Sequence, residues 1–289
     1  MTNSPLSRFA SRVLPPLEQY MWGYLDGSDN AHLAQAMRYS LVAGGKRLRP
    51  LLVLAVAQAY GAVLEDALPA AAAIEFIHTY SLIHDDLPAM DNAQTRRGQP
   101  ANHVRFDEAT AILAGDALLT DAFDLVGKTA VPVDKRCELV QILANAAGSR
   151  GMVAGQQLDI DGSAHQLNSA QLDQLNAHKT GALIRGAVAM GAVIGGAPAA
   201  DRVMLERFAG AFGLGFQLLD DIDDVTMTSQ ELGKPAHQDD ANAKNTYVAL
   251  LGLEGARTAL AEQTALAETA LAELSVDTQV LASIAQYLK

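Results

Sequence analysis

Long segments rich in Ala, Leu, Glu and Gln make up most of the chain, and they constrain its fold more than any other feature. These residue types favour helices, whereas the alternating β-branched runs that are typical of strands do not appear. Glycine and proline separate the segments, for example at Gly44-Gly45, Pro88 and Pro132. The pattern predicts helices at about 31–43, 50–60, 67–86, 107–127, 134–161, 169–196, 201–224 and 242–273.

Nothing in the sequence divides these segments into separate units. There is no repeat with a period of about 20–50 residues, which excludes a solenoid, and no linker of low complexity. The chain is 49% hydrophobic, so it can bury a large core, and intrinsic disorder is excluded. We therefore predict one all-α domain that spans residues 1–289 and forms a single large helical bundle.

Charge and cysteine content exclude several classes of protein. With 21 Lys and Arg against 33 Asp and Glu the net charge is −12, which argues against a nucleic-acid partner. The single cysteine, Cys137, cannot form an internal disulfide and favours a reducing compartment, so we expect a cytoplasmic protein. The apolar segment 180–200 is rich in Ala and Gly and contains Arg185 and Pro198. It predicts a closely packed bundle helix rather than a membrane span.

Two aspartate clusters each follow a long apolar segment: Asp85-Asp86 with Asp91, and Asp220-Asp221-Ile222-Asp223-Asp224. A solvated helix end would explain one such cluster as well as a site would, but two clusters in this position favour a site. Carboxylates are unfavourable at the negative end of a helix dipole unless a cation offsets them. Pro88 should turn the chain so that Asp91 returns toward Asp85. Oxygen ligands without nearby cysteine suit Mg²⁺, which commonly recruits substrate phosphates.

Basic residues gather in short stretches although the chain is acidic. Arg side chains bind phosphate oxygens in a bidentate manner, and Lys side chains supply point charges. His78 lies seven residues before Asp85, so both fall on one stripe of the predicted helix. The basic stretches are 46–49, Arg96-Arg97, Lys179, and Lys234 with Lys244.

Seven motifs occur in a fixed order along most of the chain. They are GGKRLRP (44–50), IHTYSLIHDDLPAMD (77–91), RRG (96–98), GQQLD (155–159), HKTGALIR (178–185), FQLLDDIDD (216–224) and LGK (232–234). Together they resemble the head-to-tail isoprenyl diphosphate synthases of the bacterial short-chain type, similar to farnesyl diphosphate synthase. The resemblance implies the isoprenoid synthase fold around a deep central cavity, a homodimer, and Mg²⁺-dependent condensation of isopentenyl diphosphate with dimethylallyl and geranyl diphosphate.

The resemblance also implies roles for individual residues. About three Mg²⁺ ions would bridge the allylic diphosphate to Asp85, Asp86, Asp91, Asp220, Asp221 and Asp224. The residues that would hold the allylic diphosphate are Arg96, Lys179, Lys234 and Lys244. Those that would hold isopentenyl diphosphate are Gly45, Lys46, Arg49, His78 and Arg97. Thr180 and Gln217 would lie beside the developing carbocation, and the catalytic set would comprise Lys179, Thr180, Gln217, Asp85 and Asp220.

Product length depends on the residues that precede the first aspartate cluster. Tyr80 lies five residues before Asp85, which is roughly 7 Å along a helix, and its ring could form the floor of a channel, whereas Ser81 is too small. In the family, an aromatic residue here with the Pro88-Ala89 insertion goes with farnesyl diphosphate. Geranyl and geranylgeranyl diphosphate are the neighbouring alternatives. A terpene cyclase and a non-catalytic synthase subunit are the alternatives from other classes.

Overall fold

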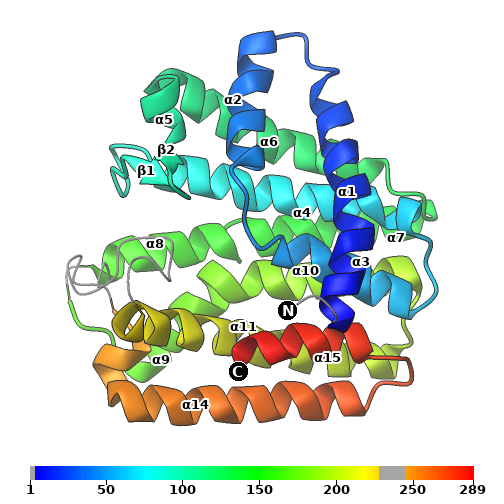
Figure 1. Ribbon diagram of the computed structural model, residues 1–289, viewed down its shortest axis with the longest axis vertical. Coiled ribbons are helices and arrows are strands. Elements are labelled where there is room, and N and C mark those ends of the chain that lie inside the picture. The colour runs from blue at the N-terminus through cyan, green and yellow to red at the C-terminus, as the bar shows by residue number, and fades with distance from the viewer. Residues whose placement is uncertain (1–3, 164, 228–244) are drawn as a thin grey trace.

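The computed structural model describes residues 4–163, 165–227 and 245–289, and the regular structure among them is almost entirely helical (Figure 1). The helices are α1 (Pro5–Leu25), α2 (Ala31–Val42), α3 (Leu48–Ala59), α4 (Leu64–Asp85), α5 (Asn102–Arg105), α6 (Glu108–Gly127), α7 (Val133–Ala147), α8 (Met152–Gly162), α9 (Ser169–Asn176), α10 (Ala182–Gly195), α11 (Ala199–Thr226), α14 (Tyr247–Ala272) and α15 (Gln279–Ala285). A π-helical turn η1 (Ala177–Gly181), a 3₁₀ turn η2 (Gln286–Leu288) and two strands, β1 (Thr95–Arg96) and β2 (Gln99–Pro100), complete the described elements.

The long helices form a stack. In Figure 1 they follow the order α6, α4, α10, α11 and α14 from top to bottom, and each contacts the next. Helix α3 contacts both α4 and α10, and α1 packs on α4 and α15. The backbone N–H of Leu6 donates to Ser283 Oγ at 3.2 Å, so the amino-terminal helix lies against the carboxy-terminal one. The layered all-α arrangement agrees with the predicted fold class.

Close packing of α10 explains the apolar segment 180–200. A side-chain Cβ at Gly191 would lie 2.6 Å from the carbonyl oxygen of Val53, and one at Gly195 would lie 2.8 Å from that of Ala57. Glycine at these positions therefore lets α10 approach α3. Among the described residues, no helix combines the length and the hydropathy that a membrane span requires.

Several boundaries differ from the predicted ones. The expected helix 134–161 is two helices, α7 and α8, because the chain turns between Gly148 and Gly151; a Cβ at Gly151 would lie 2.1 Å from the carbonyl oxygen of Ala146. The expected helix 169–196 contains the π turn η1. Helix α1 was not predicted; it accommodates Pro15 and Pro16, which normally weaken an interior helix.

Candidate active site

The first aspartate cluster folds back on the helix that carries it. Helix α4 ends at Asp85, with Asp86 as its C-cap. Pro88 cannot continue the helical hydrogen bonds, and the backbone N–H of Asp91 instead donates to the carbonyl oxygen of Asp85 at 2.9 Å. The predicted return of Asp91 to the helix end is confirmed.

The carboxylate of Asp85 is in an environment that favours a bound cation. Its pKa is raised to about 6, mainly by burial; Lys179 and Arg96 oppose the rise, and the neighbouring Asp91 and Asp86 add to it. A raised pKa means that the negative charge is poorly compensated by the protein alone. A divalent cation would supply that compensation, so the donor set fits Mg²⁺.

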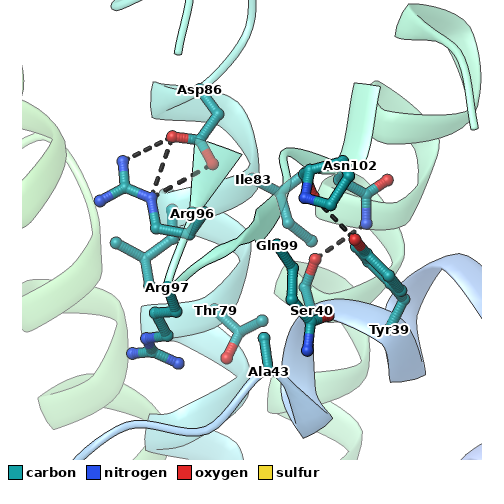
Figure 2. A pocket seen from close by; sticks show the side chains of 12 residues that line it. Tyr39, Ser40, Ala43, Thr79, Ile83, Asp86, Arg96, Arg97, Gln99 and Asn102 are labelled. Atoms are coloured by element: carbon teal, nitrogen blue, oxygen red, sulfur yellow. Dashed lines mark hydrogen bonds and ion pairs between the residues drawn. The ribbon is translucent and has the colours of Figure 1, made fainter. Parts of the chain in front are cut away.

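Asp86 pairs with Arg96 (Figure 2). Asp86 is 2% exposed, and Nε of Arg96 donates to its Oδ1 at 3.0 Å and to its Oδ2 at 3.2 Å. The guanidinium thus forms charge-assisted hydrogen bonds with both oxygens of the carboxylate. The structure joins two predicted site residues here, and Asp86 fixes Arg96 at the edge of the acidic cluster.

Arg96 and Arg97 are carried by a short hairpin that was not predicted. Strands β1 and β2 pair with Thr95 opposite Pro100 and Arg96 opposite Gln99. Arg97 and Gly98 form the turn with φ values of 54° and 77°, and positive φ at both central residues is the requirement of a type I′ hairpin turn. Gly98 at the second turn position was the available signal for this turn in the sequence.

Arg97 reaches the loop that precedes α3. Its Nη1 donates to the carbonyl oxygen of Gly44, and a Cβ at Gly45 would lie 2.7 Å from Arg97 Cζ. Gly45 also has a φ of 125°, which side chains of L residues rarely allow. The Gly-Gly pair therefore serves the close approach of Arg97, and the structure brings these two predicted residues together.

His78 lies half-buried among arginines. Burial lowers its pKa well below the usual value, and the nearby charges of Arg49 and Arg97 lower it further. Burial likewise lowers the pKa of Arg49 to about 10, while the carboxylate of Glu75 acts in the opposite direction. Arg49, His78 and Arg97 thus lie near one another, and we call this cluster of side chains the basic pocket.

The pKa of His78 has a consequence for stability. Because its folded-state pKa is depressed, His78 stabilises the fold above the unfolded-state pKa of about 6.5, and this contribution is lost as the pH falls below that value. We expect the free energy of unfolding in urea to fall between pH 7.5 and 5.5, by at most about 1.4 kcal/mol per pH unit from this residue. His78→Gln should show a shallower fall, whereas the exposed His165→Gln should keep the wild-type slope. Equal slopes in all three proteins would contradict the assignment.

A buried ion pair that was not predicted, Arg47 with Glu75, lies next to Arg49 of the basic pocket. Nη1 of Arg47 lies 2.6 Å from Oε1 of Glu75, and the two side chains are only 4% and 2% exposed. Nη2 of Arg47 donates to the carbonyl oxygen of Leu41. Arg47 therefore ties the loop before α3 to both α2 and α4. It shares its motif with Lys46 and Arg49, and the sequence offers no signal that separates its role from theirs.

Lys46 faces the second aspartate helix and the carboxy-terminal turn. Its Nζ lies 4.3 Å from the ring centroid of Tyr287 and 5.7 Å from that of Phe216. The two rings stack on each other with centroids 6.0 Å apart. A cation over aromatic faces is favourable, so Lys46 connects the glycine-rich loop with α11.

The π turn η1 presents Lys179 and Thr180. Nζ of Lys179 lies 2.5 Å from Oδ2 of Asp159, and Lys179 is close enough to Asp85 to lower the pKa of that carboxyl. A Cβ at Gly155 would lie 2.1 Å from the backbone nitrogen of Lys179. The GQQLD motif thus contributes a glycine for close approach and an aspartate that pairs with the lysine.

Thr180 begins a hydrogen-bonded chain that leads to the second aspartate cluster. Oγ1 of Thr180 and Oε1 of Gln217 are 3.1 Å apart, and Nε2 of Gln217 donates to Oδ1 of Asp221 at 2.8 Å. The backbone N–H of Tyr247 donates to Oδ2 of Asp221 at 2.7 Å. Both oxygens of Asp221 thus accept protein donors. Asp220 is half-buried and Asp224 is buried on the same helix, α11.

The turn η1 consequently lies between the two aspartate clusters. Lys179 interacts with the first cluster, and Thr180 is linked to the second through Gln217. No three His, Cys, Asp or Glu side chains in the described ranges converge closely enough to hold an ion by themselves.

The remaining predicted residues lie beside or outside this region. Tyr80 is 6% exposed, and its ring meets that of His84 edge to face at 5.8 Å. Ser81 is half-buried and donates to the carbonyl oxygen of His78 at 2.9 Å. Lys234 and Lys244 fall outside the described residues.

Comparisons with known proteins all lead to one family. The model of the polyprenyl synthetase family matches residues 30–288. The chain is 44% identical to a farnesyl diphosphate synthase of Geobacillus stearothermophilus, over 99% of this chain and 98% of that protein. Among solved structures, an FPP/GFPP synthase of Zymomonas mobilis is 36% identical with a TM-score of 0.85, covering 98% of each chain. A geranyltransferase of Helicobacter pylori, solved with magnesium and isoprenyl diphosphate, is 36% identical with a TM-score of 0.82, covering 100% of this chain and 97% of that one.

Proposed function

The chain belongs to the polyprenyl synthetase family, and from this premise we propose how its site works. It is a prenyltransferase that condenses isopentenyl diphosphate head to tail with allylic diphosphates to give farnesyl diphosphate. The proposal concerns the residues that carry the reaction, the metal, the product stop and the assembly.

The observation that carries the site assignment is the divergence of Arg96 and Arg97. The two side chains point in different directions in Figure 2, where Arg96 pairs with Asp86 at the acidic cluster. Arg97 instead donates to the carbonyl oxygen of Gly44 in the loop before α3. Two anion sites at the same hairpin, one reached by Arg96 and one by Arg97, suit two diphosphates, one allylic and one isopentenyl. A terpene cyclase acts on one diphosphate and has no use for the second pocket.

Each pocket holds one substrate in the proposed mechanism. Arg96 and Lys179 bind the allylic diphosphate, and its other cationic partners would be Lys234 and Lys244 outside the described residues. Lys46, Arg49 and Arg97 bind isopentenyl diphosphate, with neutral His78 as a hydrogen-bonding neighbour. Asp85 and Asp91 on one side and Asp220 and Asp224 on the other would hold Mg²⁺, which would supply neutralisation of charge on the leaving diphosphate.

Bond changes then follow from this placement. The allylic C–O bond breaks, its electron pair leaves with the diphosphate, and an allylic cation remains. The double bond of isopentenyl diphosphate attacks the cation and forms the new C–C bond. A proton is then lost to the departing diphosphate. Thr180 and Gln217, fixed to each other at 3.1 Å, present oxygen atoms beside the cation. Asp221 positions Gln217 because it accepts from that amide.

A product assay tests the proposal. The purified protein is incubated with Mg²⁺, isopentenyl diphosphate and either dimethylallyl or geranyl diphosphate, and the dephosphorylated products are separated by chromatography. Farnesol supports the proposal. Cyclic hydrocarbon from a single longer diphosphate would identify a cyclase, and the absence of any product would favour a non-catalytic synthase subunit.

Tyr80 is proposed to end the growing chain. It is buried on α4, five residues before Asp85, and its ring packs edge to face on that of His84. The growing product would extend along the helix until it meets this ring. Tyr80→Ala should shift the main product from farnesyl toward geranylgeranyl diphosphate or longer chains. Ser81→Ala, a change of similar depth without loss of a ring, serves as the matched control and should keep the farnesyl product. An unchanged product from Tyr80→Ala would show that Tyr80 alone does not set the stop.

The assembly and location are also proposed. We propose one domain over residues 1–289, acting as a homodimer in the cytoplasm. Helix α6 exposes Ile112 and Leu113, with 43% and 57% of their surface accessible, and we propose that this part of α6 lies in the dimer interface. Light scattering of the purified protein tests the homodimer.

A further inference from the structure

The hairpin that carries Arg96 and Arg97 is too small to hold its own shape. Each strand has two residues, and an isolated hairpin of any length is marginal in water. Arg97 has a φ of 54°, a left-handed conformation that is unfavourable for an L residue other than glycine. Contacts with the rest of the fold must therefore hold the hairpin in place.

Two kinds of contact surround it. The guanidinium groups of Arg96 and Arg97 bind Asp86 and Gly44, but these are the groups that substrates would engage. The base of the hairpin is held separately. Oη of Tyr39 donates to the carbonyl oxygen of Pro100 at 2.8 Å. Nδ2 of Asn102 donates to the carbonyl oxygen of Ala36 at 2.9 Å and to Oγ of Ser40 at 2.8 Å.

Tyr39, Ser40 and Asn102 form what we call the hairpin clamp. All three line the small pocket of Figure 2, where the hairpin lies over α2 and α4. Asn102 is 3% exposed, so its two donated bonds are shielded from water and costly to lose. The ring of Tyr39 packs edge to face on Phe106 with centroids 5.5 Å apart, which fixes the direction of its hydroxyl.

We propose that Tyr39 and Asn102 are positioning residues for both diphosphate pockets. They fix the base of the hairpin to α2, and the hairpin holds Arg96 and Arg97 in their diverging orientations at once. The inference rests on the proposed function. It predicts different kinetic effects for the two kinds of residue. Loss of one arginine weakens the binding of one substrate, whereas loss of the clamp weakens the binding of both.

Steady-state kinetics with two variants test this inference. Tyr39→Phe removes one hydroxyl and keeps the ring, and Asn102→Ala removes the two donated bonds. A hydrogen bond of this kind changes an equilibrium about two- to tenfold. We expect the KM for the allylic substrate and the KM for isopentenyl diphosphate each to rise about three- to tenfold, with kcat changing less. Hydrogen exchange at residues 95–101 should become faster in both variants.

Tyr60→Phe is the matched control. It also removes one hydroxyl that makes a hydrogen bond between distant segments, here from the end of α3 to Oδ2 of Asp201 at 2.9 Å, but it lies outside the hairpin contacts. It should lower the melting temperature and leave both KM values at the wild-type level. If the wild-type protein condenses the substrates while the clamp variants keep both KM values or change only one, the proposed positioning role of the clamp is wrong. If the wild-type protein does not condense them, the proposed function fails instead.

Discussion

Asp85→Ala is expected to lower kcat about 10²-fold or more at saturating substrate and Mg²⁺, and Asp220→Ala should do the same. Loss of a group that stabilises transition-state charge has an effect of this size. Asp85 is well placed for this role because its charge is poorly compensated by the protein, as its raised pKa of about 6 indicates. Steady-state rates measured across a Mg²⁺ titration check the prediction.

Asp134→Ala is the matched control for this prediction. Asp134 is an exposed aspartate in the first turn of α7, so its loss removes the same charge from the protein without touching the site. It should keep wild-type kcat and the wild-type Mg²⁺ dependence. Near-normal turnover of Asp85→Ala, or full wild-type activity in EDTA, contradicts the metal assignment.

The aspartate clusters could be predicted because their geometry is local. The return of Asp91 to Asp85 follows from Pro88 and the end of one helix, and all of these lie within seven residues. The all-α architecture followed from helix propensity and from the spacing of glycine and proline. Such features depend on short-range backbone preferences, which the sequence displays directly.

The contacts that could not be predicted join residues far apart in the sequence. Arg47 and Glu75 are 28 residues apart, and Lys179 and Asp159 are 20 apart. The clamp bond from Asn102 to Ala36 spans 66 residues. Nothing in the spacing of such residues indicates that they meet, because the contact depends on how whole helices pack. The GQQLD motif illustrates this limit of sequence analysis. Its position among the seven motifs supported the resemblance to the family, but its contact with Lys179 is seen only in the structure.

Separate roles for the two groups of cations give the other large expected effect. Arg97→Ala should raise the KM for isopentenyl diphosphate about 10- to 150-fold, because loss of a charge-assisted contact costs roughly 1.5–3 kcal/mol. Its effect on the allylic KM should be small, since Arg97 points to the Gly44 side of the hairpin. Lys179→Ala should raise the allylic KM and lower kcat, because Lys179 lies beside Asp85.

Initial rates measured with each substrate varied at saturation of the other separate these effects. Lys128→Ala removes an exposed lysine that pairs with Asp124 on α6, and it should leave both KM values unchanged. Equal rises of both KM values in Arg97→Ala and in Lys179→Ala would mean that the two pockets act as one. If both KM values rise in the clamp variants alone, the two pockets are separate. The clamp then affects both substrates because the hairpin base supports Arg96 and Arg97 together. The pattern across these variants therefore distinguishes a residue that binds one diphosphate from one that positions the binding groups of both.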